Sequence, residues 1–196
     1  MNSSDESSGR QFVVAVMSRD RVGIVRDVTR ALGRWDANVE HASQTVVMNY
    51  FTLIMVVGFP ESHTVAAVRD LLRTAGTPGE LEVGVKLVEP TANQPVVSDI
   101  DRFILTAVGA DRPGIVRELA TFCAARGINI TDLYGTTTAD GQFIVISELA
   151  VPRRWELAQL QLDLAQLGQR IGVQVTLQHE NIFRATNEVT APGMFT

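Results

Sequence analysis

The chain has 196 residues, of which 45% are hydrophobic and 20% charged, the balance of an ordinary globular protein. The formal net charge is −5 and no segment is rich in Lys and Arg, which argues against direct binding to nucleic acid. The single cysteine, Cys123, excludes an intrachain disulfide, and no apolar run reaches about 18 residues, so we expect a cytoplasmic chain without a membrane span.

Residues 1–10 are polar and Ser-rich and lack the apolar core of a signal peptide, so we expect a disordered tail there. Strand-like apolar runs and apolar residues at helical spacing then alternate, and together they predict a first domain over residues 11–89. The pattern predicts strands over residues 11–18, 39–48, 51–59 and 81–88, a hairpin turn at Asn49-Tyr50, and helices over residues 21–35 and from residue 60.

Residues 90–100 have no periodicity and include Pro90 and Pro95, which predicts a linker. The same order of elements then returns in a second domain over residues 101–182, and residues 183–196 are expected to form a C-terminal tail. The second set of predicted strands covers residues 103–108, 128–138, 143–151 and 173–177, with a hairpin turn at 139–141 and helices over residues 113–126 and 154–171.

One segment of the sequence occurs twice. Asp20-Arg21-Val22-Gly23-Ile24-Val25-Arg26 returns 91 positions later as Asp111-Arg112-Pro113-Gly114-Ile115-Val116-Arg117, and the flanking residues match in register. A period of this length indicates duplication of a whole domain. Because each copy has the order βαββαβ, the predicted fold class is α+β: two tandem ferredoxin-like domains, each a four-stranded antiparallel sheet with two helices on one face.

The repeated segment joins a strand to a helix, where physical chemistry favours an anion site. We expect Asp111 to cap the helix by accepting from the amide of Gly114, and Pro113 to lie in the first helical turn. Gly114 carries no side chain to block the free amides at the positive end of the helix. Asn129 begins the next strand, which we expect near this loop, so that Asp111 and Asn129 present oxygens to an ammonium group.

An anion site beside ammonium acceptors suits the two ends of an amino acid, and the first copy offers Asp20, Gly23 and Asn38 for the same purpose. A capped turn with Gly and Pro also occurs in proteins that bind nothing, so a purely structural loop remains an alternative. Val22 replaces the proline in the first copy, which makes that loop less rigid.

The pattern Asp-Arg-Pro-Gly-Ile-Val, followed by Asn129-Ile130 within βαββαβ, resembles the ACT domain. Two such domains, the hairpin segment 50–55 and the tail segment 177–184 together resemble the glycine cleavage system transcriptional repressor family. The resemblance covers residues 11–184. It implies a non-catalytic regulator that binds an amino acid at ACT–ACT interfaces and acts through a protein partner, possibly a DNA-binding regulator, with a homodimer as the expected assembly.

The ligand-binding residues that the two loops and the resemblance predict are Asp111, Arg112, Pro113, Gly114, Ile115, Val116 and Asn129, with Asp20, Arg21, Val22, Gly23, Ile24 and Asn38 in the first copy. No nucleophile–base pair or metal-ligand spacing is visible, so we expect no catalytic residue, no metal and no cofactor. A ligand-free interaction module and an enzyme of unrecognised type remain the alternatives.

Overall fold

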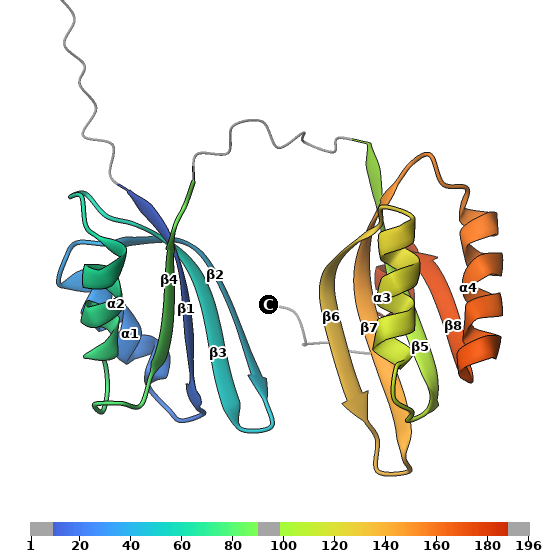
Figure 1. The fold of residues 1–196 in the computed structure, drawn as a ribbon, viewed down its shortest axis with the longest axis horizontal. Coiled ribbons are helices and arrows are strands. Elements are labelled where there is room, and N and C mark those ends of the chain that lie inside the picture. Colours follow the sequence, from blue (N-terminus) through green and yellow to red (C-terminus); the bar gives the residue numbers. More distant parts are fainter. Residues whose placement is uncertain (1–9, 90–98, 188–196) are drawn as a thin grey trace, which may run out of the picture. The chain divides into compact units, whose positions relative to one another are not determined.

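The computed structural model describes residues 10–89 and 99–187 (Figure 1). The chain divides between Ala92 and Asn93 into two compact units, here named unit 1 and unit 2. Most of the predicted N-terminal tail, most of the predicted linker and the last nine residues of the predicted C-terminal tail lie outside the described residues.

Unit 1 has the order βαββαβ, and its strands form one antiparallel sheet in the order β2-β3-β1-β4. Both helices pack on the same face of this sheet (Figure 1). The elements are β1 (Gln11–Arg19), α1 (Ile24–Gly33), β2 (Asn38–Val47), β3 (Tyr50–Gly58), α2 (Val65–Arg73) and β4 (Glu82–Leu87).

Unit 2 repeats this topology in a sheet of order β6-β7-β5-β8, and a further helix follows its last strand. The predicted fold class, two tandem α+β modules, is therefore confirmed. The elements are β5 (Ile100–Ala110), α3 (Ile115–Ala125), β6 (Asn129–Thr137), β7 (Gln142–Pro152), α4 (Leu157–Ile171), β8 (Val173–His179) and α5 (Glu180–Asn187).

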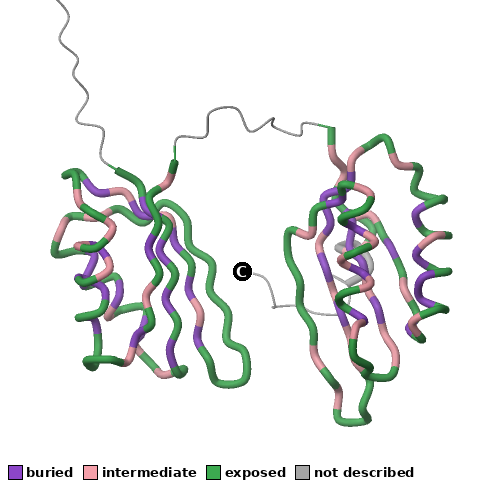
Figure 2. The backbone as a smooth tube through the Cα atoms, in the orientation of Figure 1, coloured by how far each residue is buried: buried purple, intermediate pink, exposed green. Residues whose placement is uncertain are grey.

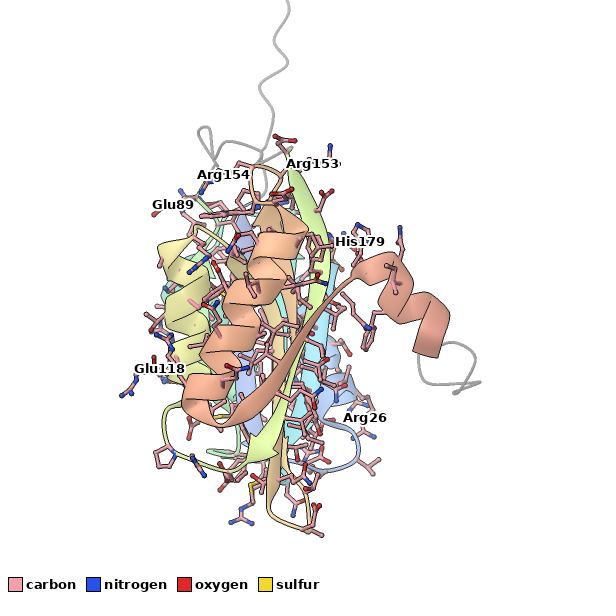
Figure 3. The ribbon with its side chains drawn as sticks, turned by 90° about the vertical axis from the view of Figure 1, so that its right-hand side faces the viewer. Arg26, Glu89, Glu118, Arg153, Arg154 and His179 are labelled. Carbon is pink, nitrogen blue, oxygen red and sulfur yellow. The ribbon has the colours of Figure 1, made fainter. Side chains whose placement is uncertain are left out.

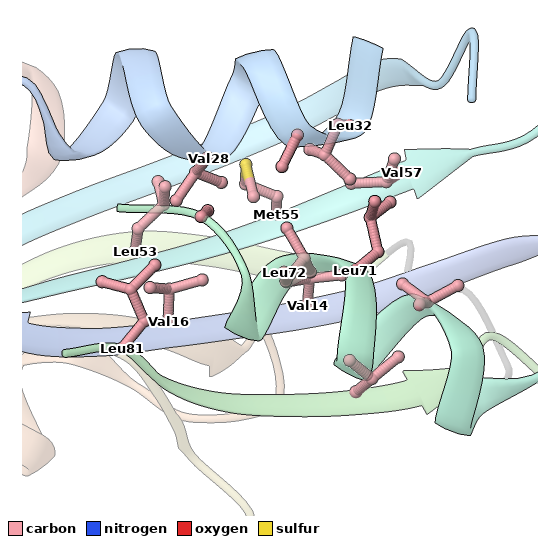
Figure 4. Close-up of a cluster of buried hydrophobic side chains, with 14 of the residues drawn as sticks. Val14, Val16, Val28, Leu32, Leu53, Met55, Val57, Leu71, Leu72 and Leu81 are labelled. Atoms are coloured by element: carbon pink, nitrogen blue, oxygen red, sulfur yellow. The ribbon is translucent and has the colours of Figure 1, made fainter. Parts of the chain in front are cut away.

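Each unit has its own hydrophobic core between the sheet and its two helices. In unit 1, β1 alternates strictly between exposed and buried residues, so Phe12, Val14 and Val16 all point toward the helices. Val28 of α1 and Leu72 of α2 pack against them (Figure 4). A strand period of two and a helix period of 3.6 place these side chains on facing surfaces, which explains why the pattern alone identified the elements.

The strand at one edge of each sheet has little buried surface. Every residue of β2 is exposed (Figure 2), and most residues of β6 are as well. Both strands also carry an irregularity in register near their start, between Val39 and His41 and between Ile130 and Asp132. Bulges at such positions bend an edge strand and limit its pairing with other strands.

Many element boundaries differ from the prediction by a few residues, and three of these differences have clear local causes. Helix α2 begins at Val65 because the Thr64 hydroxyl caps it, accepting from the amide of Ala67 at 3.1 Å. Helix α4 begins at Leu157, after a turn in which the Trp155 ring nitrogen donates to the carbonyl of Arg126 at 2.9 Å. The first hairpin turns at Met48-Asn49, both with positive φ, and Tyr50 already belongs to β3.

Helix α5 includes residues 183–187, which the sequence pattern had placed in the tail. The amide of Asn181 donates to the ring nitrogen Nδ1 of His179 at 3.3 Å, and Glu180 lies in the first turn, where a negative charge is favourable. Helix α5 lies on the opposite side of β5 from α3 and α4 (Figure 3).

Candidate functional site

The repeated loop has the same backbone in both units. Gly23 has φ +95° and Gly114 has φ +98°, and each immediately precedes a helix without a side-chain cap. Only glycine adopts this left-handed region readily, so the turn itself requires glycine here. No described residue accepts from the amides of Ile115, Val116 or Arg117, so the start of α3 keeps free donors, as the prediction of an anion site requires.

The expected capping of the helix by Asp111 is wrong. The Asp111 carboxylate instead accepts from the Thr137 hydroxyl at 3.2 Å, and its amide donates to the carbonyl of Gly141 at 3.3 Å. In unit 1 the amide of Asp20 similarly donates to the carbonyl of Asn49 at 2.8 Å. The aspartate therefore ties the loop to the neighbouring hairpin turn, because Gly114 occupies the capping position.

Pro113 precedes the helix and does not lie in its first turn, which corrects a second detail of the prediction. Pro113 and Val22 are both exposed, and Val22 has almost its whole surface accessible. The next apolar residues, Ile24 and Ile115, are buried in the cores. Buried isoleucine and positive-φ glycine thus fix the loop, whereas the residue between Arg and Gly is free to differ between units.

Arg21 forms an ion-pair network that closes the loop of unit 1. Its guanidinium donates to both carboxylate oxygens of Glu80, with an Nη2–Oε2 distance of 2.9 Å, and lies 3.0 Å from Asp27. Hydrogen bonds from Arg21, and then from the backbone amide of Thr77, lower the pKa of the Glu80 carboxyl to about 2. The pKa of the Asp27 carboxyl is also lowered, first by Arg26 and then by Arg21.

Arg112 in unit 2 has no such partner. Gly172 occupies the position that Glu80 has in unit 1. Glu80 is two residues before Glu82, which pairs with Met17, and Gly172 is two residues before Gln174, which pairs with Val108, the counterpart of Met17. The Arg112 guanidinium extends over Gly172, 3.0 Å from where a β-carbon would lie. Within the described part of the chain, Arg112 forms no hydrogen bond or ion pair, so its charge remains available.

The two asparagines lie far from the loops of their own units. Asn129 pairs with Ala150, which also pairs with Arg102 near the start of β5, whereas Asp111 follows the end of β5. Asn38 is likewise level with the first residue of β1. A strand of nine residues spans roughly 30 Å, so the expectation that one unit brings Asp and Asn together is wrong.

Arg26 and Arg117 were not predicted, although they lie beside the glycines. The Arg117 guanidinium is 3.2 Å from where a β-carbon on Gly114 would lie, and Arg26 is 3.3 Å from the same point on Gly23. Each arginine also bonds the acidic residue that follows it, Asp27 or Glu118. The sequence indicated these arginines only through their position in the repeated segment, three residues after the glycine.

Other chemistry is sparse in the described residues. They include no group of three or more His, Cys, Asp or Glu placed to hold a metal. No described helix has the length and apolarity needed to cross a membrane. Cys123 is buried in the core of unit 2, and burial raises the pKa of its thiol to about 11.

Comparison with known proteins places both units in one family. The family model for the ACT domain matches residues 10–86 and again residues 101–178. A UPF0237 protein of Methanosarcina acetivorans is 36% identical over 89 residues, which cover 45% of this chain and 96% of that protein. A UPF0237 protein of Methanopyrus kandleri is 34% identical over 92 residues, covering 45% of this chain and 98% of that one.

Two solved structures match most of the chain. A protein of unknown function from Galdieria sulphuraria has a TM-score of 0.71 and 26% identity, covering 87% of this chain and 98% of that one. A protein described as a glycine cleavage system transcriptional repressor has a TM-score of 0.65 and 23% identity, covering 86% of this chain and 96% of that one. At this identity the similarity concerns the fold alone. From its two family matches and its doubled βαββαβ fold, the chain belongs to the ACT domain family.

Proposed function

We propose that this chain is a non-catalytic regulatory protein that binds a small amino acid through its ACT domains and transmits the bound state to a protein partner. The observation that carries the proposal is the loop of unit 2. Free helix amides and the Arg117 guanidinium lie beside the Gly114 turn, and the neighbouring Arg112, which has no hydrogen bond or ion pair among the described residues, extends over Gly172. Positive charge at a helix start favours a carboxylate. The site residues are those that the sequence predicted in the loops, with Arg117 added.

The ammonium end of the ligand needs acceptors, and Asn129 is the residue proposed for this task. Because Asn129 lies at the far end of its own sheet from Asp111, one domain supplies the loop and a different ACT domain supplies the asparagine. This arrangement places the ligand at an interface between domains. Binding would then change how domains associate, which is a direct route from ligand to partner.

Unit 2 is proposed as the stronger site. In unit 1 the Arg21 guanidinium is already occupied by Glu80 and Asp27, so a ligand carboxylate would have to compete with both. Pro113 also fixes its own φ and restricts Arg112, so less ordering is needed on binding than in the loop with Val22. The partner is proposed to be a DNA-binding regulator, since the chain's net charge of −5 disfavours direct contact with DNA.

A thermal-shift screen of the full chain against the twenty amino acids tests the proposal. A ligand that binds the folded state must raise the melting temperature as its concentration rises. Asn129→Ala should then weaken calorimetric binding by about 1–3 kcal/mol, because a buried charged ligand group loses its acceptor. Asn181→Ala in α5 is the control and should bind as the wild type does. If no amino acid raises the melting temperature, the ligand-free interaction module becomes the better hypothesis.

A further inference from the structure

The connection that precedes the last strand of the sheet differs between the two units. In unit 1, residues 74–81, here called the strap, lie between α2 and β4. In unit 2, Gly172 alone lies between α4 and β8. The order of strands in the two sheets is otherwise the same, so the strap is a feature that unit 1 has and unit 2 lacks.

The strap folds back on itself and orders the side chain of Glu80. Gly76 has φ +72° and Gly79 has φ +79°, and the amide of Glu80 donates to the carbonyl of Thr77 at 3.0 Å. The amide of Thr77 in turn donates to Oε2 of Glu80 at 2.9 Å. The backbone of the strap therefore holds the carboxylate that the strap carries, and this carboxylate needs little further ordering to bind a partner.

The partner of this carboxylate is Arg21, in the repeated loop. The Nε and Nη2 atoms of Arg21 donate to different oxygens of Glu80, which is the fork-like geometry that makes guanidinium–carboxylate pairs both strong and selective. With the amide of Thr77, three donors surround one carboxylate. The Glu80 side chain is only 18% exposed, so most of it is shielded from water. Glu80 is thus held as a bound carboxylate ligand would be held.

The charges around this contact are balanced only when Glu80 is present. Asp27 lies 3.0 Å from the Arg21 guanidinium and 2.8 Å from that of Arg26, so one carboxylate already serves two arginines. Glu80 supplies the second negative charge. Without it, two guanidinium groups would share the charge of Asp27 alone, and the loop would attract an anion from solution.

We infer that the strap of unit 1 is an internal occupant of its loop: Glu80 holds Arg21 as the carboxylate of an amino acid would hold Arg112, so that unit 1 is closed and the chain binds one amino acid, in unit 2. This inference rests on the function proposed above and names the unit that responds to the ligand. A tethered carboxylate acts at an effective concentration on the order of millimolar, so a free amino acid well below that concentration does not displace it.

Chemical rescue with acetate tests whether the loop of unit 1 is a carboxylate site. Glu80→Ala removes the tethered carboxylate and leaves Arg21 in place, so the variant should melt at a lower temperature than the wild type. Acetate should then raise its melting temperature in proportion to the binding of the free carboxylate. The rise should exceed that of the wild type, and sodium chloride at the same ionic strength should not reproduce it.

Two matched variants show whether the rescue uses the place that Glu80 vacates. Glu80→Gln fills that place with an uncharged side chain, so acetate should raise its melting temperature no more than it raises that of the wild type. Arg21→Gln combined with Glu80→Ala removes the guanidinium and should also abolish the extra rise. If acetate stabilises Glu80→Ala and Glu80→Gln equally, Arg21 does not hold an exchangeable carboxylate and the inference is overturned.

Calorimetry measures how many amino acids each chain binds, using one that stabilises the wild type. The wild type should bind one per chain. Glu80→Ala should bind two, and adding Arg21→Gln to it should restore the number to one. Two ligands per wild-type chain would overturn the inference and leave the proposed function intact. Binding of no amino acid by either the wild type or Glu80→Ala would overturn both, whereas failure of the acetate rescue alone overturns only the inference.

Discussion

Arg21 donates from two guanidinium nitrogens to the carboxylate of Glu80, which lies 59 residues further along the chain. This contact joins the loop after β1 to the segment before β4 and so closes one end of unit 1. In unit 2 the corresponding residues are Arg112 and Gly172, and the contact is missing. Two copies with one fold have therefore diverged in the chemistry of the loop that is their shared signature.

The first prediction concerns the pH dependence that Glu80 gives to unit 1. Its pKa is lowered from the ordinary 4.5 to about 2 in the folded protein, so its stabilising effect is complete above pH 4.5 and is lost as the pH falls toward 2. Glu80→Gln should lower the melting temperature at neutral pH and lose less stability than the wild type across that acid window. Thermal unfolding at a series of pH values measures both effects.

An exposed carboxylate without a described hydrogen bond provides the control for this experiment. Glu61→Gln should leave the melting temperature at neutral pH unchanged, and it should not alter how steeply the melting temperature falls between pH 4.5 and pH 2. If Glu61→Gln and Glu80→Gln have the same acid slope, the Arg21–Glu80 pair does not contribute to folding stability as the structure indicates.

The second prediction separates a glycine required by the backbone from one that is not. Gly114 has φ +98°, and a β-carbon there would also displace the Arg117 guanidinium, so Gly114→Ala should destabilise the protein by about 1–2 kcal/mol. Gly33 ends α1 with open space around its α-carbon, so Gly33→Ala should stabilise by up to about 1 kcal/mol. Urea unfolding measures the free energy of unfolding of each variant. If both substitutions changed it in the same direction, this account would be refuted.

The sequence predicted the fold well because its information is local and periodic. Strand alternation, as in β1, and helical spacing, as in α1, each depend on a few neighbouring residues, and the repeat supplied the same answer twice. The Asp-Gly turn before β7 was predicted for the same reason, since Gly141 has the positive φ that the turn needs.

The site was harder to predict because it depends on which residues meet in space. Glu80 carries no local signal of its pairing with Arg21. The position of Asn129 was misjudged because α3 carries the chain back along the sheet, so β6 begins level with the start of β5 and not with its end. The role of Asp111 was misjudged because a glycine in the left-handed conformation replaced the side-chain cap.

The third prediction concerns the single thiol. Cys123 is buried in α3, and desolvation raises the pKa of its thiol to about 11, so at pH 8 it should be protonated and inaccessible. A chromogenic disulfide reagent should therefore react with it only as fast as unit 2 opens, and urea should raise the rate together with the unfolded fraction. Immediate stoichiometric reaction of the native protein would show that this core is open.

The last prediction uses the difference between Glu80 and Gly172 to test the ligand loop. Gly172→Asp should give Arg112 the carboxylate that Arg21 already has in unit 1, and so weaken the binding of an amino acid whose carboxylate competes for Arg112. Gly172 has φ +76°, a conformation that Asp and Asn tolerate better than other side chains. Gly172→Asn is therefore the matched control, with the same shape and strain but no charge.

Calorimetry with an amino acid that stabilises the wild type should show weaker binding for Gly172→Asp than for Gly172→Asn. High salt should reduce this difference in affinity, because screening weakens an exposed ion pair. Arg112→Gln should bind as weakly as Gly172→Asp, since both remove the available positive charge. If Gly172→Asp and Gly172→Asn bind equally well, Arg112 does not hold the ligand carboxylate, and the free amides at the start of α3 must bind it without that arginine.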